Sequence, residues 1–202
     1  MSGTATPADP GRYYELCFRE GAGRIVFRYK EKGITLGEDR MAWQTDGRKA
    51  EGRYADIDGI RLSTGHIPKS GPIGECRITF RSGLVLAITS ATKWGHSDED
   101  RNGAYIEFVR DFHRRLSTAD KGRIRFEAGN TPGRQMFGRI ALVLGGAFFV
   151  LLPLALFFLT GEFEALGITA AGAVFLWPVL ILIRKNEPRT YSPDHLDEDL
   201  FP

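Results

Sequence analysis

Histidine and cysteine side chains are the groups in this sequence that most readily act as bases, nucleophiles or metal ligands. His66 falls in an expected loop, and His113 lies at the border of an expected helix, where we expect it to pack rather than to act as a base. His96 and His195 each precede an acidic run, which could bind a hard cation loosely. Acidic loops and tails are usually solvated, so the sequence predicts no metal site.

The motifs typical of enzymes do not occur. Gly21-Ala22-Gly23 lacks the third glycine of a dinucleotide-binding motif and precedes an expected strand, which favours a hairpin turn. Cys17 and Cys76 have no Cys-x-x-Cys spacing, and we expect both thiols to be free and buried. No nucleophile, base and orienting group fall into a recognisable arrangement. The sequence therefore predicts a protein that is not an enzyme, with no catalytic residues and no cofactor.

The charge balance restricts the class of partner. The 202 residues include 27 Lys and Arg against 25 Asp and Glu, a net charge of +2, which excludes a strongly basic nucleic-acid binder. Hydrophobic residues make up 43% of the chain and include 14 Phe, which excludes wholesale disorder. The apolar residues are concentrated in the last third of the sequence, in two long runs.

These two runs predict membrane-spanning helices. Fourteen of the twenty residues at 140–159 are Leu, Ile, Val or Phe, which together favour membrane insertion by about 4 to 8 kcal/mol. The run at 166–183 is weaker but lies beside the first, so a helical hairpin is favoured over a buried core helix. Neither run contains an ionisable residue, so we do not expect this chain alone to form a channel or transporter.

Small residues recur four apart in both runs. Ala141 and Gly145 form one such pair, and Gly167 and Ala171 form the other. This spacing allows helix backbones to approach closely. It favours two spans that pack on each other, and a docking face for another membrane protein is the alternative.

The flanking charges predict the orientation of the hairpin. The connector 160–165 contains no Lys or Arg, whereas basic residues precede the first span and follow the second. The positive-inside rule places both termini in the cytoplasm. Residues 1–10 lack an apolar core, so no export signal is expected. We predict contact with the anionic membrane surface for eight basic residues: Lys121, Arg123, Arg125, Arg134, Arg139, Arg184, Lys185 and Arg189.

The region between the N-terminal tail and the first span reads as mainly β with one helix. Asp46-Gly47 is a strong hairpin signal, and residues 73–80 alternate between apolar and polar. Strands are expected at 13–18, 25–29, 34–36, 41–45, 48–54, 60–63, 73–80 and 84–89, and a last one at 123–127.

A single amphipathic helix is expected after these strands. Residues 97–100 resemble a capping box that begins at Ser97. The helix presents one apolar stripe, formed by Tyr105, Val109, Phe112 and Leu116. We expect its outer face to carry Glu107, Arg110, Asp111, Arg114 and Arg115.

About seven antiparallel strands followed by one helix resemble the pleckstrin-homology (PH-like) superfold. The segment Arg53-Tyr54-Ala55-Asp56-Ile57-Asp58-Gly59-Ile60-Arg61-Leu62 is similar to a segment of small bacterial PH-like membrane proteins. Residues 186–193 and the ending Leu200-Phe201-Pro202 resemble the tail of proteobacterial proteins of this type. Many such proteins place their spans before the domain, whereas here the spans follow it. The resemblance implies a binding scaffold without catalytic residues.

The resemblance also bears on a basic group in the first expected hairpin. In PH-like domains that bind phosphoinositides, a basic loop between early strands holds the phosphates. The corresponding residues are Arg24, Arg28, Lys30 and Lys32. Because bacteria generally lack those lipids, we expect a solvated strand face there.

The expected fold class is an α+β membrane protein, with an antiparallel PH-like β-barrel or sandwich capped by one helix and followed by a two-helix transmembrane hairpin. The expected parts are a flexible tail at 1–10, a cytoplasmic PH-like domain at 11–130, transmembrane helices at 137–159 and 166–183 around a short external turn at 160–165, and a cytoplasmic acidic tail at 184–202. That acidic tail could rest on the basic domain or recruit a basic partner.

These expectations lead to a functional hypothesis. The chain is predicted to be a multi-pass protein of the bacterial inner membrane, acting as a binding, adaptor or sensing module at the cytoplasmic surface. Its predicted partners are the lipid bilayer and a membrane or cytoplasmic protein, with no nucleic acid. That protein would dock on the open sheet edge or in the groove beside the helix. The alternative is an accessory or assembly subunit of a larger membrane complex, contacting partners through its hairpin.

Overall fold

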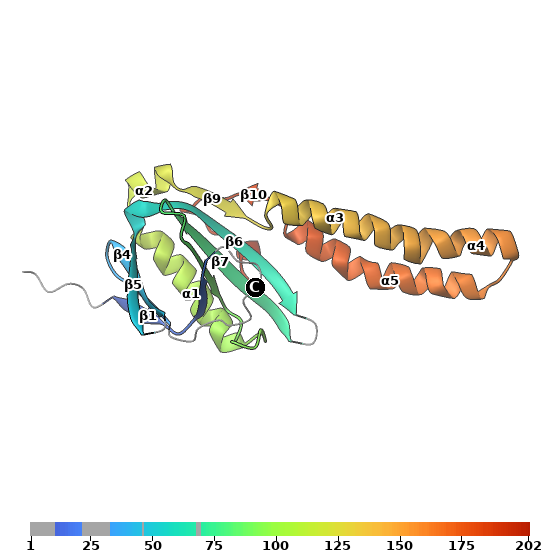
Figure 1. Ribbon diagram of the computed structural model, residues 1–202, viewed down its shortest axis with the longest axis horizontal. Coiled ribbons are helices and arrows are strands. Elements are labelled where there is room, and N and C mark those ends of the chain that lie inside the picture. The colour runs from blue at the N-terminus through green and yellow to red at the C-terminus, as the bar shows by residue number, and fades with distance from the viewer. Residues whose placement is uncertain (1–10, 22–32, 46, 68–69) are drawn as a thin grey trace, which may run out of the picture. The chain divides into compact units, whose positions relative to one another are not determined.

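The computed structural model describes residues 11–21, 33–45, 47–67 and 70–202, and it divides into two compact units (Figure 1). Unit 1 contains the described residues up to Glu127 together with Thr190–Pro202, and unit 2 is Ala128–Arg189. The predicted tail at 1–10, the strand predicted at 25–29 and the basic group at 24–32 lie outside the described residues.

Unit 1 is an α+β fold with two sheets. The first sheet has the order β1-β3-β4-β5, formed by Arg12–Tyr14, Ile34–Leu36, Arg40–Thr45 and Arg48–Arg53. The second sheet has the order β10-β9-β6-β7-β8-β2, formed by Arg189–Thr190, Arg125–Ala128, Ile57–Ile67, Gly71–Phe80, Val85–Thr89 and Cys17–Glu20. Strands β1, β3, β4 and β5 pair antiparallel with their neighbours, as do β6, β7, β8 and β2.

The strand predicted at 13–18 is wrong in one respect, because it is two strands. β1 ends at Tyr14 and pairs with β3, whereas β2 begins at Cys17 and pairs with β8. Between them the Leu16 amide donates to the Tyr14 carbonyl at 3.0 Å, which turns the chain from one sheet to the other. Tyr14, Leu16 and Cys17 are buried and Glu15 is exposed, so the alternation of a single strand continues through the bend. This stretch therefore joins the two sheets.

The hairpin predicted at residues 46–47 is confirmed. Thr45 pairs with Arg48, which leaves a two-residue turn, and Gly47 has a φ of +81° as such turns require. The strand predicted at 60–63 is longer than expected, because β6 pairs with β7 from Ile57 to Ile67. The predicted last strand at 123–127 is β9, which begins at Arg125.

The predicted helix is confirmed as α1, Glu99–Arg115, but its capping residue is different. The Asp98 carboxylate accepts from the amides of Asp100 and Arg101 at 3.0 and 3.3 Å, whereas the Ser97 hydroxyl donates to the Pro72 carbonyl. Both residues are good caps, and the Ser97 hydroxyl is already used on Pro72, so Asp98 caps the helix and its carboxylate also interacts favourably with the helix dipole.

The apolar face of α1 packs closely on β7. The predicted stripe of Tyr105, Val109, Phe112 and Leu116 is buried, and Phe108 adds to it. Gly74 lies beneath the Tyr105 ring, where an added Cβ would be 2.3 Å from the nearest ring carbon. Any side chain at position 74 would therefore push the helix away from the sheet.

The C-terminal segment, Thr190–Pro202, belongs to unit 1. Its Tyr191 amide donates to the Phe126 carbonyl of β9 at 3.3 Å. Leu200 and Phe201 are buried, and a short 3₁₀ helix, η3 (Glu198–Leu200), packs on β6. The structure agrees with the first expectation for the acidic tail, because residues 190–202 pack on unit 1.

Unit 2 is a helical hairpin. One arm is a continuous helix at Pro132–Thr160, made of α3 (Pro132–Gly146), the π-helical turn η2 (Ala147–Leu151) and α4 (Leu152–Thr160). The other arm is α5, Glu164–Lys185. Both arms are long and apolar enough to cross a membrane, and each predicted span lies within one of them. The π-helical turn precedes Pro153, which has no amide hydrogen for the carbonyl four residues earlier.

The arms of the hairpin pack on each other at glycines. Gly172 is buried, and an added Cβ there would be 2.4 Å from the Phe149 carbonyl oxygen. Gly145 contacts Leu176 in the same way, whereas no atom lies within 4 Å of a Cβ added at Gly167. The pair Gly167 and Ala171 is therefore not a packing site in this hairpin, and Gly172 takes that role.

Candidate functional site

A cavity of about 520 Å³ lies in unit 1 between α1, β1, α2 (Thr118–Arg123) and the C-terminal segment. Its charged lining consists of four cationic side chains and two carboxylates: Arg12, Arg110, Arg114 and Lys121 with Glu107 and Asp194. His113, Pro193 and Leu196 complete the lining. The lining therefore carries more positive than negative charge.

The spacing of residues on α1 creates this arrangement. Glu107, Arg110 and Arg114 follow one another by three and four residues, which places them on one face of the helix. Arg12 enters from β1 and Lys121 from α2, and Asp194 comes from the C-terminal segment. The outward direction predicted for Glu107, Arg110 and Arg114 agrees with their exposure.

Three of the four cations contact carboxylates, but Arg114 shares its carboxylate, Asp111, with Arg115. Arg12 donates to the Glu107 carboxylate at 2.5 Å, and the Lys121 ammonium donates to Asp194 at 2.6 Å. Arg110 instead lies with its guanidinium carbon 5.4 Å from the centre of the Phe201 ring. Arg114 lies 3.4 Å from Asp111 and remains 72% exposed. The excess positive charge is therefore at Arg110 and Arg114.

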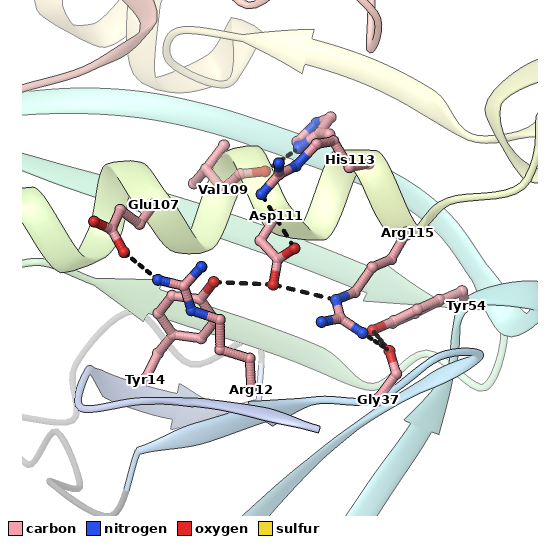
Figure 2. A network of polar contacts seen from close by, with 10 residues as sticks. Arg12, Tyr14, Gly37, Tyr54, Glu107, Val109, Asp111, His113 and Arg115 are labelled. Carbon is pink, nitrogen blue, oxygen red and sulfur yellow. Dashed lines mark hydrogen bonds and ion pairs between the residues drawn. The ribbon is translucent and has the colours of Figure 1, made fainter. Parts of the chain in front are cut away.

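Asp111 is the centre of a polar network beside this cavity (Figure 2). The Tyr14 hydroxyl donates to its carboxylate at 2.9 Å, and the Arg115 guanidinium donates to it at 3.2 Å. Arg115 and the Tyr54 hydroxyl both donate to the Gly37 carbonyl at 3.0 Å. The network joins β1, the turn after β3 and α1. Its hydrogen bonds therefore stabilise the packing of these elements.

Burial, together with the Asp111 hydrogen bond, raises the pKa of Tyr14 to about 12. Tyr14 is therefore a protonated donor at neutral pH. Burial also raises the pKa of Tyr54. Both hydroxyls consequently hold their acceptors throughout the physiological range.

The prediction that Asp111 lies on the outer face of the helix is wrong, because only 7% of it is exposed. Phe108, three residues earlier, was not counted in the apolar stripe. Residues three apart share a helix face, so including Phe108 widens the buried face to cover Asp111. The position of Phe108 in the sequence could therefore have predicted that Asp111 is buried.

The variant Asp111→Asn is expected to lower the free energy of unfolding of unit 1 by about 2 kcal/mol, because it removes the charge that binds Arg115 and leaves buried donors less well satisfied. Chemical denaturation of the full chain in neutral detergent measures this change. Asp100→Asn, at an exposed position in the first turn of the same helix, is the control and should cost no more than about 0.5 kcal/mol. Equal effects of the two variants would contradict a central role for Asp111.

His113 lies inside unit 1 and connects α1 to the C-terminal segment. Its Nδ1 is 2.7 Å from the Val109 carbonyl, and its Nε2 is 2.9 Å from the Tyr191 hydroxyl. Burial lowers the pKa of His113 to about 4, so the imidazole is neutral at pH 7. Nδ1 then donates to Val109, and Nε2 accepts from Tyr191. His113 also contacts the rings of Phe112 and Phe126, so it is the packing residue that was predicted.

The structure distributes the eight predicted membrane-contact residues between the two units. In unit 1, Lys121 pairs with Asp194, Arg125 pairs with Asp58 at 2.5 Å, and Arg123 donates to the carbonyls of Ile57 and Tyr54 and to Asp120. In unit 2, Arg139 pairs with Glu187. The others are exposed near the ends of the helices: Arg134, Arg184, Lys185 and Arg189. Arg123 thus has a structural use that the sequence did not reveal.

Within the described ranges, no three His, Cys, Asp or Glu side chains are placed to hold a metal ion. Near the chain end, His195 and Asp197 form a pair with their atoms 3.2 Å apart. Cys17 and Cys76 are buried, as predicted, and burial raises the pKa of the Cys76 thiol.

A scan against protein-family models found no match to this sequence, and a search of curated proteins found none either.

Proposed function

We propose that this chain is a membrane-anchored binding module, in which unit 2 spans the bacterial inner membrane and unit 1 binds its partner at the cytoplasmic surface. The observation that carries the proposal is the exposure of large apolar side chains along both arms of the hairpin. Phe148, Phe158 and Leu159 on one arm and Val174 and Phe175 on the other are more than half exposed. An apolar surface of this extent is stable in lipid and costly in water.

The composition of unit 1 supports the proposed topology. Unit 1 includes chain on both sides of the hairpin, up to Glu127 and again from Thr190. If the hairpin spans the bilayer, both of its ends must lie on the side that holds unit 1. The connector between the arms has no Lys or Arg, whereas Arg134, Arg184 and Lys185 lie near the other ends. By the positive-inside rule that side is the cytoplasm.

The strand order supports a PH-like assignment for unit 1. Four strands, β1-β3-β4-β5, form one sheet, and β6-β7-β8-β2 form the core of the other. β1 and β2 are parts of one stretch that belongs to both sheets, and α1 follows β8. Counting that stretch once, seven strands precede α1 in the described part of the chain, which agrees with the order expected for this superfold.

We assign binding in unit 1 to the cavity face of α1. Its lining combines exposed cations with a hollow, so an anionic group can enter it and accept hydrogen bonds from those cations. β9 pairs with β6, and the C-terminal segment packs on α1. The chain itself thus fills part of the groove expected beside the helix, and the cavity lies next to this segment.

Cysteine labelling tests the anchoring and orientation. Glu162→Cys, in the connector, should react with a membrane-impermeant maleimide in intact spheroplasts. Asp58→Cys, at a half-exposed position in unit 1, should react only after the membrane is opened. The full chain should also resist extraction by alkaline carbonate. Labelling of Asp58→Cys from outside, or release by carbonate, would overturn the proposal.

A hairpin replacement separates a binding module from a subunit that acts through its spans. An unrelated two-span hairpin in place of residues 132–185 should preserve any specific co-purifying protein if unit 1 carries recognition. Loss of that protein on replacement, with unit 1 still folded, would favour an accessory subunit that binds through the membrane.

A further inference from the structure

The arrangement of Arg110 and Arg114 is electrostatically unfavourable by itself. The two arginines are four residues apart on α1, so their side chains are neighbours on one helix face. Like charges at this spacing destabilise a helix. Both carboxylates that line the cavity are already engaged, Glu107 with Arg12 and Asp194 with Lys121. A bound anion would remove this repulsion.

The two guanidinium groups also differ from the other cations in how they are held. Arg110 is held over the Phe201 ring, a contact that positions a guanidinium without neutralising it. Arg114 reaches Asp111 only at 3.4 Å, and that carboxylate also accepts from Tyr14 and Arg115. Planar guanidinium groups offer paired N–H donors, which match the oxygens of a phosphate group.

The size and surroundings of the cavity favour a small ligand over a peptide. About 520 Å³ is within the range of small-molecule sites. The place that an acidic peptide would take is already used by the C-terminal segment, through Asp194 on Lys121 and Phe201 beneath Arg110. The space that remains is bounded by this segment and by α1.

We propose that this cavity binds a phosphate-bearing ligand, with Arg110 and Arg114 as the groups that hold the phosphate. The proposal rests on the proposed function, since it names the ligand class for the binding site of unit 1. Arg12 and Lys121 border the site, each held in place by its carboxylate. The phosphate comes either from a soluble compound or from a lipid headgroup.

The test uses the full chain and two probes. Inorganic pyrophosphate, titrated calorimetrically into the chain in a neutral detergent, represents the soluble source. Nanodiscs of phosphatidylcholine with or without phosphatidylglycerol represent the headgroup source, with hydrogen exchange of residues 107–121 as the readout. The variant Arg110→Gln/Arg114→Gln removes the proposed clamp. Arg48→Gln/Lys49→Gln, at exposed positions on β5, removes the same charge elsewhere.

We expect the wild-type chain to bind pyrophosphate or to be protected by phosphatidylglycerol. Arg110→Gln/Arg114→Gln should reduce that binding or protection at least tenfold, whereas Arg48→Gln/Lys49→Gln should not. Arg114→Lys, which keeps the charge but not the paired donors, should bind with intermediate affinity. Pyrophosphate binding identifies a soluble ligand, and protection only with phosphatidylglycerol identifies a headgroup. The proposal is overturned if neither probe acts, if both double variants lose binding equally, or if a synthetic 190–202 peptide binds in place of phosphate. Anchoring by unit 2 is measured separately by carbonate extraction, so it can hold when this proposal fails.

Discussion

Gly74→Val is expected to destabilise unit 1 by about 3 to 5 kcal/mol, the largest effect of any single substitution considered for this fold. A Cβ at position 74 would lie 2.3, 2.8 and 2.9 Å from three carbons of the Tyr105 ring. That ring is fully buried between α1 and β7, so it has no space to move. The helix must therefore separate from the sheet. Urea denaturation of the full chain in detergent, followed by fluorescence of the buried Trp43, measures the loss.

Two further variants identify the cause of that loss. Gly103→Val places the same side chain on α1 where no atom lies within 4 Å of the new Cβ, so it should change stability by less than about 1 kcal/mol. Tyr105→Phe should be neutral or stabilising by about 1 kcal/mol, because the buried Tyr105 hydroxyl has no hydrogen-bond partner among the residues that the structure describes. A stable Gly74→Val variant would show that α1 and β7 do not pack this closely.

The second large effect concerns acid. The pKa of His113 falls from an ordinary value of 6.5 to about 4 in the folded chain. Below pH 6.5 His113 is protonated in the unfolded chain but stays neutral in the folded chain until the pH nears 4. The free energy of unfolding therefore decreases as the pH falls from 6.5 towards 4. The decrease from this group is about 3 kcal/mol. Urea midpoints measured from pH 7.5 to pH 4 report it.

Substitutions of His113 and His195 test whether this pH dependence comes from His113. His113→Phe keeps a ring against Phe112 and Phe126 but cannot be protonated. Its stability at pH 7 should be lower, because the Tyr191 hydroxyl loses its acceptor, and its decrease between pH 6.5 and 4 should be smaller by about 3 kcal/mol. His195→Phe, on an exposed histidine of the same chain, should retain the wild-type profile. Identical profiles for His113→Phe and the wild type would show that His113 is not buried and neutral.

Local signals in the sequence were sufficient for the hairpin at 46–47 and for α1, but not for α2 or for the two strands at 12–20. Asp46-Gly47 specified its hairpin because few residue pairs adopt that turn, and the period of the apolar residues specified α1. The capping residue was missed by one position, because Ser97 and Asp98 are both good caps and only the contact of Ser97 with Pro72 separates them.

The candidate site depended on contacts that no local pattern contains. His113 meets Tyr191, 78 positions away, and Lys121 meets Asp194, 73 positions away. The eight basic residues were selected by their distance in sequence from the predicted spans. In space, Lys121 and Arg123 are instead used within unit 1. The bend at Leu16 was hidden for a related reason, because β1 and β2 differ in their pairing partners and not in a local pattern of residues.

The return of Thr190–Pro202 to unit 1 has a consequence for biogenesis. A ribosome makes residues 1–127 first and the hairpin next, so Tyr191, Leu200 and Phe201 emerge only after both apolar helices have been made. Until then unit 1 lacks Tyr191, whose hydroxyl donates to His113, and it lacks the buried side chains of Leu200 and Phe201. If the hairpin is the anchor proposed above, completion of unit 1 follows synthesis of that anchor, and a chain cut before Tyr191 lacks part of the core of unit 1 and is more open to proteolysis.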